Sequence, residues 1–413
     1  MLWVGMIASA TDYHRVSYGA RHSLDIKSRV VRLFQKEYGH APAYVARAPG
    51  RVNLLGEHVD YNAGFVLPAA IDRATYVAFS PNDSDVISFK ALDFDQVVQV
   101  SLGSIRDRKV MGGGALPSWA AYPAGVAWAL SENGQLVKGM QAAFASDVPR
   151  GAGLSSSASV ELAFAVAWMA LGGWTLPRTK LALLSQRAEN QYVGVNCGIM
   201  DQFASACGEK DRLLLLDCRS LEYRLLGLPD DVDIVIADTT VRHSHTTSAY
   251  NDRRAACEEA VRTLQRELPG VTSLRDVSLQ DFNRLSSNLP PEIEKRARHV
   301  VEEIDRTLRA VQLLEGGDLA GFGLAMNACH ASLRDLYEVS CPEADTMARI
   351  AQGLEGCYGA RITGGGFGGC TVNLVSRAQT TSFVRVLGQR YESATKLHPE
   401  IYVCAASGGA GLI

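Results

Sequence analysis

The stretch Gly151-Ala152-Gly153-Leu154-Ser155-Ser156-Ser157-Ala158-Ser159 leads into a long apolar segment over residues 160–171, which predicts a buried helix. Glycine and alanine at the start of the stretch carry no large side chain that would keep a ligand from the backbone. The serine hydroxyls follow where the first turn of a helix exposes unpaired N–H groups, and the helix dipole there favours an anion. The stretch therefore predicts a phosphate-binding loop, although a plain connector between loop and helix also fits it. It lacks the lysine of the GxxxxGK[ST] phosphate loop.

Chain length and composition predict a globular protein of two lobes. The 413 residues exceed what one hydrophobic core usually supports, and they are 47% hydrophobic and 21% charged. The net charge of −3, without a long basic run, argues against binding to nucleic acid or to a membrane surface. No apolar stretch reaches the roughly 18–20 residues that span a bilayer. We therefore expect neither a nucleic-acid nor a membrane partner.

The cysteines and histidines give no pattern of a zinc site. Nine cysteines lack CxxC or CxxH spacing, so we expect reduced thiols and a cytoplasmic location. His243 and His245 form an HxH pair without a nearby third ligand, which favours a surface or hinge role over metal binding. The apolar residues 1–10 have no basic region before them, so we interpret them as an extended start rather than a secretory signal.

Hydrophobic periodicity predicts strands and helices in both halves of the chain. Strands are expected over residues 44–48, 85–92, 140–146, 213–216, 232–237, 370–375 and 401–405, and helices over residues 119–130, 160–171, 178–192, 250–268, 292–314 and 318–337. Because these elements do not follow a strict βαβ repeat, they indicate an α+β fold with mixed sheets. We place the junction of the lobes near Asp238, with an N-terminal lobe over residues 1–235 and a C-terminal lobe over residues 236–413.

Two further motifs give the serine stretch a context. The first is ARAPGRVNLLGEHVDYN over residues 46–62, and the second combines Ser340-Cys341-Pro342 with RITGGGFGGC over residues 361–370. In this order the three motifs resemble those of the GHMP small-molecule kinases. The first motif, together with GIMDQF over residues 198–203, resembles the galactokinase branch. The resemblance extends from about residue 30 to the C-terminus.

The resemblance implies a fold and a reaction. It implies the two-lobed GHMP kinase fold, with mixed or antiparallel sheets in both lobes and the active site in the cleft between them. The implied reaction is transfer of phosphate from ATP to the anomeric hydroxyl of α-D-galactose, with Mg²⁺ as cofactor, by a monomer without an obligate protein partner. The alternatives are a kinase for a related sugar, such as N-acetylgalactosamine or arabinose, and a galactokinase-like sensor of sugar and ATP.

Phosphoryl transfer requires a triphosphate cradle, a metal, a positioned nucleophile and positive charge near the transferred group. The cradle is expected at Gly151, Ala152, Gly153, Leu154, Ser155, Ser156 and Ser157. Mg²⁺ prefers hard oxygen ligands and takes few of them from protein. By resemblance these ligands are the Ser157 hydroxyl and the carboxylate of Glu189 in the segment QRAEN.

By resemblance the catalytic residues are Asp201 and Arg51. Asp201 is implied as the base at the anomeric hydroxyl, because a hydroxyl attacks poorly unless its proton is accepted. The Arg51 guanidinium is the counterpart cation near the γ-phosphate. A different division of labour stays open, in which Asp201 only orients the sugar and Arg51 stabilises the transition state.

Sugar recognition needs short polar side chains that converge on hydroxyls. Glu57, His58 and Asp60 supply three within four residues, and we place them on an irregular loop after a strand. The resemblance adds Gly198 and Tyr250 to the sugar site. Val59 departs from the threonine usual in galactokinases, with little expected effect on catalysis.

Two more motifs complete the predicted nucleotide site. Trp119 and Tyr122 resemble the WxxY element beside the adenine pocket, although a core tryptophan fits Trp119 equally well. Ala121 and Pro123 depart from the usual residues of this element. The glycine-rich motif at Gly364, Gly365 and Gly366 suits a close approach to phosphates or substrate, and also a tight turn into a strand.

Overall fold

The computed structural model describes residues 17–242 and 246–413, so residues 1–10 and the His243 and His245 pair lie outside the described residues. The helices are α1 (Gly19–Tyr38), α2 (Ser118–Glu132), α3 (Ser156–Gly172), α4 (Arg178–Arg187), α5 (Met200–Cys207), α6 (Thr246–Leu264), α7 (Leu279–Leu285), α8 (Pro291–Glu315), α9 (Leu319–Asp335), α10 (Pro342–Gln352) and α11 (Thr380–Thr395). The strands are β1 (Ser17–Tyr18), β2 (Tyr44–Asn53), β3 (Phe65–Val66), β4 (Pro68–Pro81), β5 (Val86–Ala91), β6 (Val97–Ser101), β7 (Met140–Ser146), β8 (Arg212–Asp217), β9 (Tyr223–Gly227), β10 (Val232–Arg242), β11 (Cys357–Thr363), β12 (Gly368–Ser376), β13 (Glu400–Cys404) and β14 (Gly411–Leu412).

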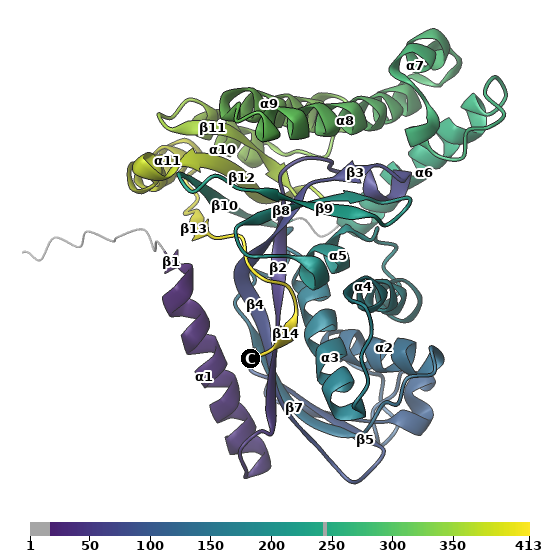
Figure 1. Cartoon of the computed structure of the whole chain (residues 1–413), viewed down its shortest axis with the longest axis vertical. Helices are drawn as coiled ribbons and strands as arrows, with labels where there is room; N and C mark the ends of the chain where they lie inside the picture. The colour runs from purple at the N-terminus through teal and green to yellow at the C-terminus, as the bar shows by residue number, and fades with distance from the viewer. Residues whose placement is uncertain (1–16, 243–245) are drawn as a thin grey trace, which may run out of the picture.

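A six-stranded sheet in the order β14-β2-β4-β7-β5-β6 forms the centre of the N-terminal half. Helix α1 lies along one face of this sheet, and α3 with α2 and α5 covers the other (Figure 1). Val30 and Phe34 of α1 pack against Ala74 and Ala78 of β4, whereas Phe164 of α3 belongs to the core on the opposite face. Because helices cover both faces, β4 is buried along almost its whole length instead of alternating.

A five-stranded sheet in the order β1-β13-β10-β12-β11 forms the centre of the C-terminal half. Helices α9, α10 and α11 pack on it, and α8 runs alongside α9 at the top of Figure 1. A small third sheet, β3-β8-β9, is built from residues 65–66, 212–217 and 223–227. The pairing is mostly antiparallel, but β5 with β7 and β1 with β13 are parallel, so the expected mixed sheets are confirmed.

The two ends of the described chain cross between the large sheets. Strand β1, near the start, pairs with β13 in the C-terminal sheet, and β14, near the end, pairs with β2 in the N-terminal sheet (Figure 1). Strand β10 contains the boundary between residues 235 and 236, and the two-lobe division stays a prediction. None of the described helices combines the length and the apolar character needed to cross a bilayer.

The expected elements are present, with longer or shifted bounds. Helix α3 begins at Ser156, four residues before the apolar run, so the serine stretch supplies its first turn. The helix expected over residues 178–192 is α4, continued by a π-helical turn over Ala188–Val193. Strand β2 continues through the GRVN motif to Asn53, with a bulge between Pro49 and Arg51. This bulge allows the strand to carry Arg51 to the site.

Candidate active site

A cavity of about 290 Å³ lies where the two large sheets meet. It brings together the predicted site residues Arg51, Glu57, His58, Asp60, Gly151, Gly153, Glu189, Gly198, Asp201, Tyr250, Gly364, Gly365 and Gly366. The residues that contribute come from both halves of the chain, as expected for a site between lobes. The other predicted residues lie outside its lining: Trp119, Tyr122, Ala152, Leu154, Ser155, Ser156 and Ser157.

The serine stretch and the glycine-rich motif contact each other backbone to backbone. Gly153 has a φ of +77°, and a Cβ there would lie 2.7 Å from the carbonyl oxygen of Thr363. Gly364 has a φ of +83°, and its Cβ would lie 2.5 Å from the Cα of Gly153. Both positions require glycine because of the left-handed backbone and because of the close approach. The two motifs thus form one wall of the cavity.

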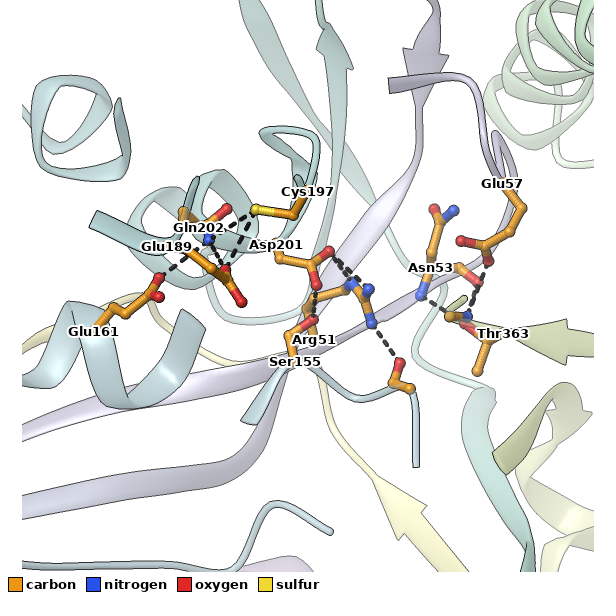
Figure 2. A network of polar contacts seen from close by, with 12 residues as sticks. Arg51, Asn53, Glu57, Ser155, Glu161, Glu189, Cys197, Asp201, Gln202 and Thr363 are labelled. Carbon is orange, nitrogen blue, oxygen red and sulfur yellow. Dashed lines mark hydrogen bonds and ion pairs between the residues drawn. The ribbon is translucent and has the colours of Figure 1, made fainter. Parts of the chain in front are cut away.

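Arg51 and Asp201 form an ion pair at the cavity (Figure 2). Arg51 donates from Nε to Asp201 Oδ1 over 2.9 Å, and its Nη2 lies 2.7 Å from the same oxygen. Arg51 Nη1 also donates to the carbonyl of Gly153 over 2.5 Å, which ties the guanidinium to the serine stretch. Ser155 donates its hydroxyl to Asp201 Oδ2 over 2.6 Å. Both oxygens of Asp201 are therefore hydrogen-bonded and its orientation is fixed.

Ser155 reaches Asp201 because its backbone is left-handed, with φ 59° and ψ 48°. It occupies the N-cap position of α3, but its side chain makes no capping bond to the helix. A left-handed serine is strained, and such strain is typical of functional sites. The sequence places Ser155 in the phosphate cradle, and the structure adds this contact with the predicted base.

Buried acidic groups gather behind Asp201 (Figure 2). Gln202 donates from Nε2 to Glu161 over 3.0 Å and to Glu189 over 2.6 Å. Burial, followed by repulsion from Asp201, raises the pKa of Glu189 to about 7, and hydrogen bonds from Cys197 and Ser157 oppose the rise. Burial and repulsion from Glu189 hold the pKa of Glu161 well above its usual value. Ser157 and Glu189, the two predicted metal ligands, thus lie close enough for Ser157 to lower the pKa of Glu189.

The loop over residues 54–59, with the short helix Asp60–Asn62, confirms the irregular segment expected after β2. His58 has a φ of 59° and lies among aromatic rings, 4.8 Å from Tyr337 and 5.5 Å from Tyr250 between ring centroids. Its Nδ1 hydrogen-bonds the hydroxyl of Tyr61 over 2.9 Å. Burial, followed by the electrostatic influence of His299, Arg361 and Arg253, holds the pKa of His58 well below its usual value, so the ring is neutral at pH 7.

Asp60 and Glu57 are the carboxylates of this loop. Asp60 borders the cavity, where enclosure by protein, followed by repulsion from Asp201, raises its pKa to about 6. A Cβ at Gly198 would lie 1.7 Å from Asp60 Oδ2, so any larger residue would displace this carboxylate. Glu57 is 3% exposed and pairs with the fully buried Arg361. Burial raises the pKa of Glu57, and attraction from Arg361 and Arg51 opposes that effect.

Trp119 and Tyr122 lie on α2 and not on the cavity wall, and Tyr122 lies near Glu189 and Glu161. Trp119 stacks on Phe94 with ring centroids 5.2 Å apart and 9° between the planes. Burial, followed by repulsion from Glu189 and Glu161, raises the pKa of Tyr122 to about 12. Trp119 therefore packs against the core, and an adenine contact at this element stays a prediction.

Sequence reasoning missed several residues of the site, among them Glu161, Gln202, Arg361 and Thr363. The sequence does contain a signal for Glu161, which is a glutamate inside the apolar run of residues 160–171. A glutamate is rarely buried without a partner, so its position there indicates a paired, buried carboxyl. Arg361 and Thr363 precede the glycine-rich motif, but nothing in the sequence shows that they face the N-terminal half. Gln202 lies next to Asp201 in sequence, and its contacts depend on the packing of α3 against α5.

Comparisons with known proteins match nearly the whole chain. Residues 32–81 match the galactokinase galactose-binding signature, residues 121–209 the GHMP kinases N terminal domain, and residues 310–392 the GHMP kinases C terminal model. The galactokinase of Roseiflexus sp. (strain RS-1) is 47% identical over 380 residues, which cover 92% of this chain and 95% of that protein. The galactokinase of Chloroflexus aurantiacus (strain ATCC 29366 / DSM 635 / J-10-fl) is 43% identical over 387 residues, which cover 94% of this chain and 97% of that protein.

Comparison with solved structures also finds a galactokinase. The crystal structure of Lactococcus lactis galactokinase complexed with galactose superposes with a TM-score of 0.88 at 35% identity, over 93% of this chain and 98% of that one. A mevalonate kinase structure at 17% identity, with a TM-score of 0.61 over 88% of this chain and 99% of that one, shares the fold alone. The expected GHMP kinase fold is thereby confirmed. The chain belongs to the galactokinase family of GHMP kinases.

Proposed function

We propose that the protein transfers the γ-phosphate of ATP to the anomeric hydroxyl of α-D-galactose, giving galactose 1-phosphate and ADP. The observation that carries this proposal is the Arg51–Asp201 ion pair, at a cavity that is bordered by the polar loop with Glu57, His58 and Asp60 and by the two glycine-rich motifs. The pair supplies a carboxylate for the attacking hydroxyl and a cation for the transferred phosphoryl group. The match to a galactokinase solved with galactose supports galactose as the sugar.

Asp201 is proposed to contact the hydroxyl that attacks the phosphate. Arg51 and Ser155 hold its two oxygens in place before the sugar binds, so little reorganisation is needed when the hydroxyl arrives. The proton of the hydroxyl passes to Asp201 as the oxygen–phosphorus bond forms and the bond to ADP breaks. Arg51, anchored to the serine stretch through the carbonyl of Gly153, is positioned to stabilise the negative charge on the phosphoryl oxygens.

Mg²⁺ is the proposed cofactor, with Ser157 and Glu189 as its protein ligands. These groups fit the ion, because both offer hard oxygen atoms and because Glu189 lies in an acidic neighbourhood, where it and Asp201 repel each other and it also repels Glu161. Within the described residues, no three acidic, cysteine or histidine side chains are placed to hold a metal by themselves. That suits Mg²⁺ in kinases, which takes most of its ligands from phosphate and water. When bound, the ion supplies charge neutralisation at the phosphates.

Sugar binding is proposed at Glu57, His58, Asp60, Gly198 and Tyr250, and triphosphate binding at residues 151–157 and 364–366. We propose the cytoplasm as the location, which is supported by the nine cysteines, all of them free thiols.

The test is sugar-dependent release of ADP from Mg·ATP with galactose, glucose, arabinose and N-acetylgalactosamine. We expect strong turnover with galactose, and a loss of about 10²–10⁴-fold in kcat for Asp201→Asn, because Asn cannot accept the proton. Asp318→Asn is the matched control, since Asp318 caps α9 at the surface and Asn caps helices equally well. Preference for another sugar would reassign the substrate, and tight binding of galactose and ATP without turnover would refute the kinase reaction.

A further inference from the structure

The carboxylate of Glu57 is held by the protein on one oxygen only. Arg361 Nη2 and the backbone N–H of Gly364 both donate to Oε2, the latter over 3.2 Å. Among residues 25–242 and 249–413, whose side chains the structure describes, no group donates a hydrogen bond to Oε1. Glu57 lines the cavity. Oε1 is therefore the oxygen left for a ligand.

Arg361 is a charged residue that water does not solvate, because its side chain is fully buried. Its exposure is 0%, and its Nε donates to the carbonyl of Ile362 over 2.7 Å. Burial lowers its pKa, but Cys329, Glu57 and Glu303 more than compensate, so the guanidinium stays charged. A buried ion pair adds little net stability compared with apolar packing, so stability alone is a weak reason for an arginine here.

Glu303 is a second buried charge that holds the loop of Glu57, through the preceding residue Gly56. It accepts the backbone N–H of Gly56 over 2.8 Å, and it pairs with Arg306 on α8. Charges of alternating sign thus lead from α8 through β11 to the loop that carries Glu57: the partly buried Arg306, then the buried Glu303, Arg361 and Glu57. Glu303 fixes the backbone just before Glu57, and Arg361 fixes the side chain of Glu57 itself.

We propose that Arg361 is a positioning residue for sugar specificity, which holds Glu57 so that Oε1 accepts a hydrogen bond from one particular sugar hydroxyl. This inference rests on the proposed function. A carboxylate held as an acceptor requires a donor at a fixed place. A sugar that lacks this hydroxyl leaves Oε1 of a buried carboxylate without a hydrogen-bond donor, and the site rejects it.

The experiment measures kcat and KM for galactose and for each monodeoxygalactose, with sugar affinity measured in parallel by calorimetry. The variants are Arg361→Lys, Glu57→Gln and the double variant. In the wild type we expect one deoxy sugar to lose about 10²–10⁴-fold in kcat/KM. In Arg361→Lys this loss should shrink at least about tenfold, with a higher KM for galactose and nearly unchanged KM for ATP. In the Glu57→Gln background, Arg361→Lys should not change the discrimination further.

Arg296→Lys is the matched control. Arg296 is also buried and ion-paired, with Glu338, but it does not contact Glu57, so the discrimination should stay as in the wild type. A purely structural role of Arg361 would lower turnover and stability alike for every sugar, and unchanged discrimination in Arg361→Lys would overturn the inference. Turnover of galactose by the wild type tests the proposed function separately. If turnover fails, the ratio of the affinities for galactose and for each deoxy sugar, measured by calorimetry, still tests the role of Arg361.

Discussion

At the scale of single residues, the site is dominated by carboxyl groups that repel one another. Burial raises the pKa of Asp60, of Glu189 and of Glu161, and repulsion from Asp201 raises each of these pKa values further. Arg51 is the cation that contacts Asp201 directly. A site with this excess of buried acid is suited to a ligand that arrives with a divalent cation, because the cation reduces the repulsion.

Asp60 gives a stability prediction with a definite sign. Its pKa rises from 3.8 unfolded to about 6 folded, so the folded state binds the proton more tightly, and stability falls as pH rises from about 4 to about 6. Above pH 6 the whole penalty is present, at most about 3 kcal/mol. Asp60→Asn should therefore raise the free energy of unfolding at pH 7.5 by about 1–3 kcal/mol, and the gain should vanish below pH 4.

Urea unfolding at pH 7.5, 5.0 and 4.0 measures this effect, with Asp318→Asn as the exposed control. The same variant should bind galactose more weakly, since the proposed sugar contact is lost. A loss of stability at pH 7.5 would show that hydrogen bonds of Asp60, such as the one from the backbone of Tyr61, outweigh its burial and repulsion.

At the scale of elements, the sequence predicts the helix after the serine stretch and the irregular loop with Glu57, His58 and Asp60. The local sequence was sufficient to predict both elements, because a long apolar run and a dense polar cluster are each compatible with few kinds of local structure. Strand β4 was missed because Asp72 and Arg73 interrupt its apolar run and a proline stands at each end. The Arg361–Glu57 pair could not be predicted from the sequence, because the two residues are 304 positions apart and only tertiary packing brings them together.

The contact between the two glycine-rich motifs gives a prediction at this scale. Gly364→Ala should lose at least about 3 kcal/mol of stability and raise the KM for ATP, because it combines a left-handed alanine with a collision against Gly153. Gly173→Ala is the matched control: Gly173 has a φ of +68° but nothing within 4 Å of its Cβ position. It should lose only about 1 kcal/mol. Equal losses in urea unfolding would mean that the backbone conformation, and not the contact, explains the need for glycine.

At the scale of the whole molecule, Thr363 joins the two large sheets. Its hydroxyl accepts the backbone N–H of Asn53 and donates to the carbonyl of the same residue, each over 3.2 Å, so the end of β11 is bonded to the end of β2 (Figure 2). Thr363→Val keeps the shape of the side chain and removes both bonds. We expect a loss of about 1–3 kcal/mol of stability and a clear loss of galactose affinity, because the walls of the cavity are no longer fixed to each other.

Thr371→Val is the comparison for Thr363→Val. Thr371 is also fully buried, but its hydroxyl bonds Asn373 within the same strand. This variant should lose stability and keep its affinity for galactose, which calorimetry and urea unfolding measure separately. An equal change in affinity for both variants would show that the bridge between the sheets does not shape the sugar site.

The crossed ends of the chain have a consequence for biosynthesis. During translation β2 leaves the ribosome long before its partner at the sheet edge, β14, because the two strands lie far apart in the chain. The nascent chain must therefore carry an open sheet edge on β2 until β14 has been made, and an open edge invites pairing with other chains. For the same reason the gene cannot be divided between the lobes into two fragments that each contain a complete sheet: the first fragment would lack β14, and the second would lack β1.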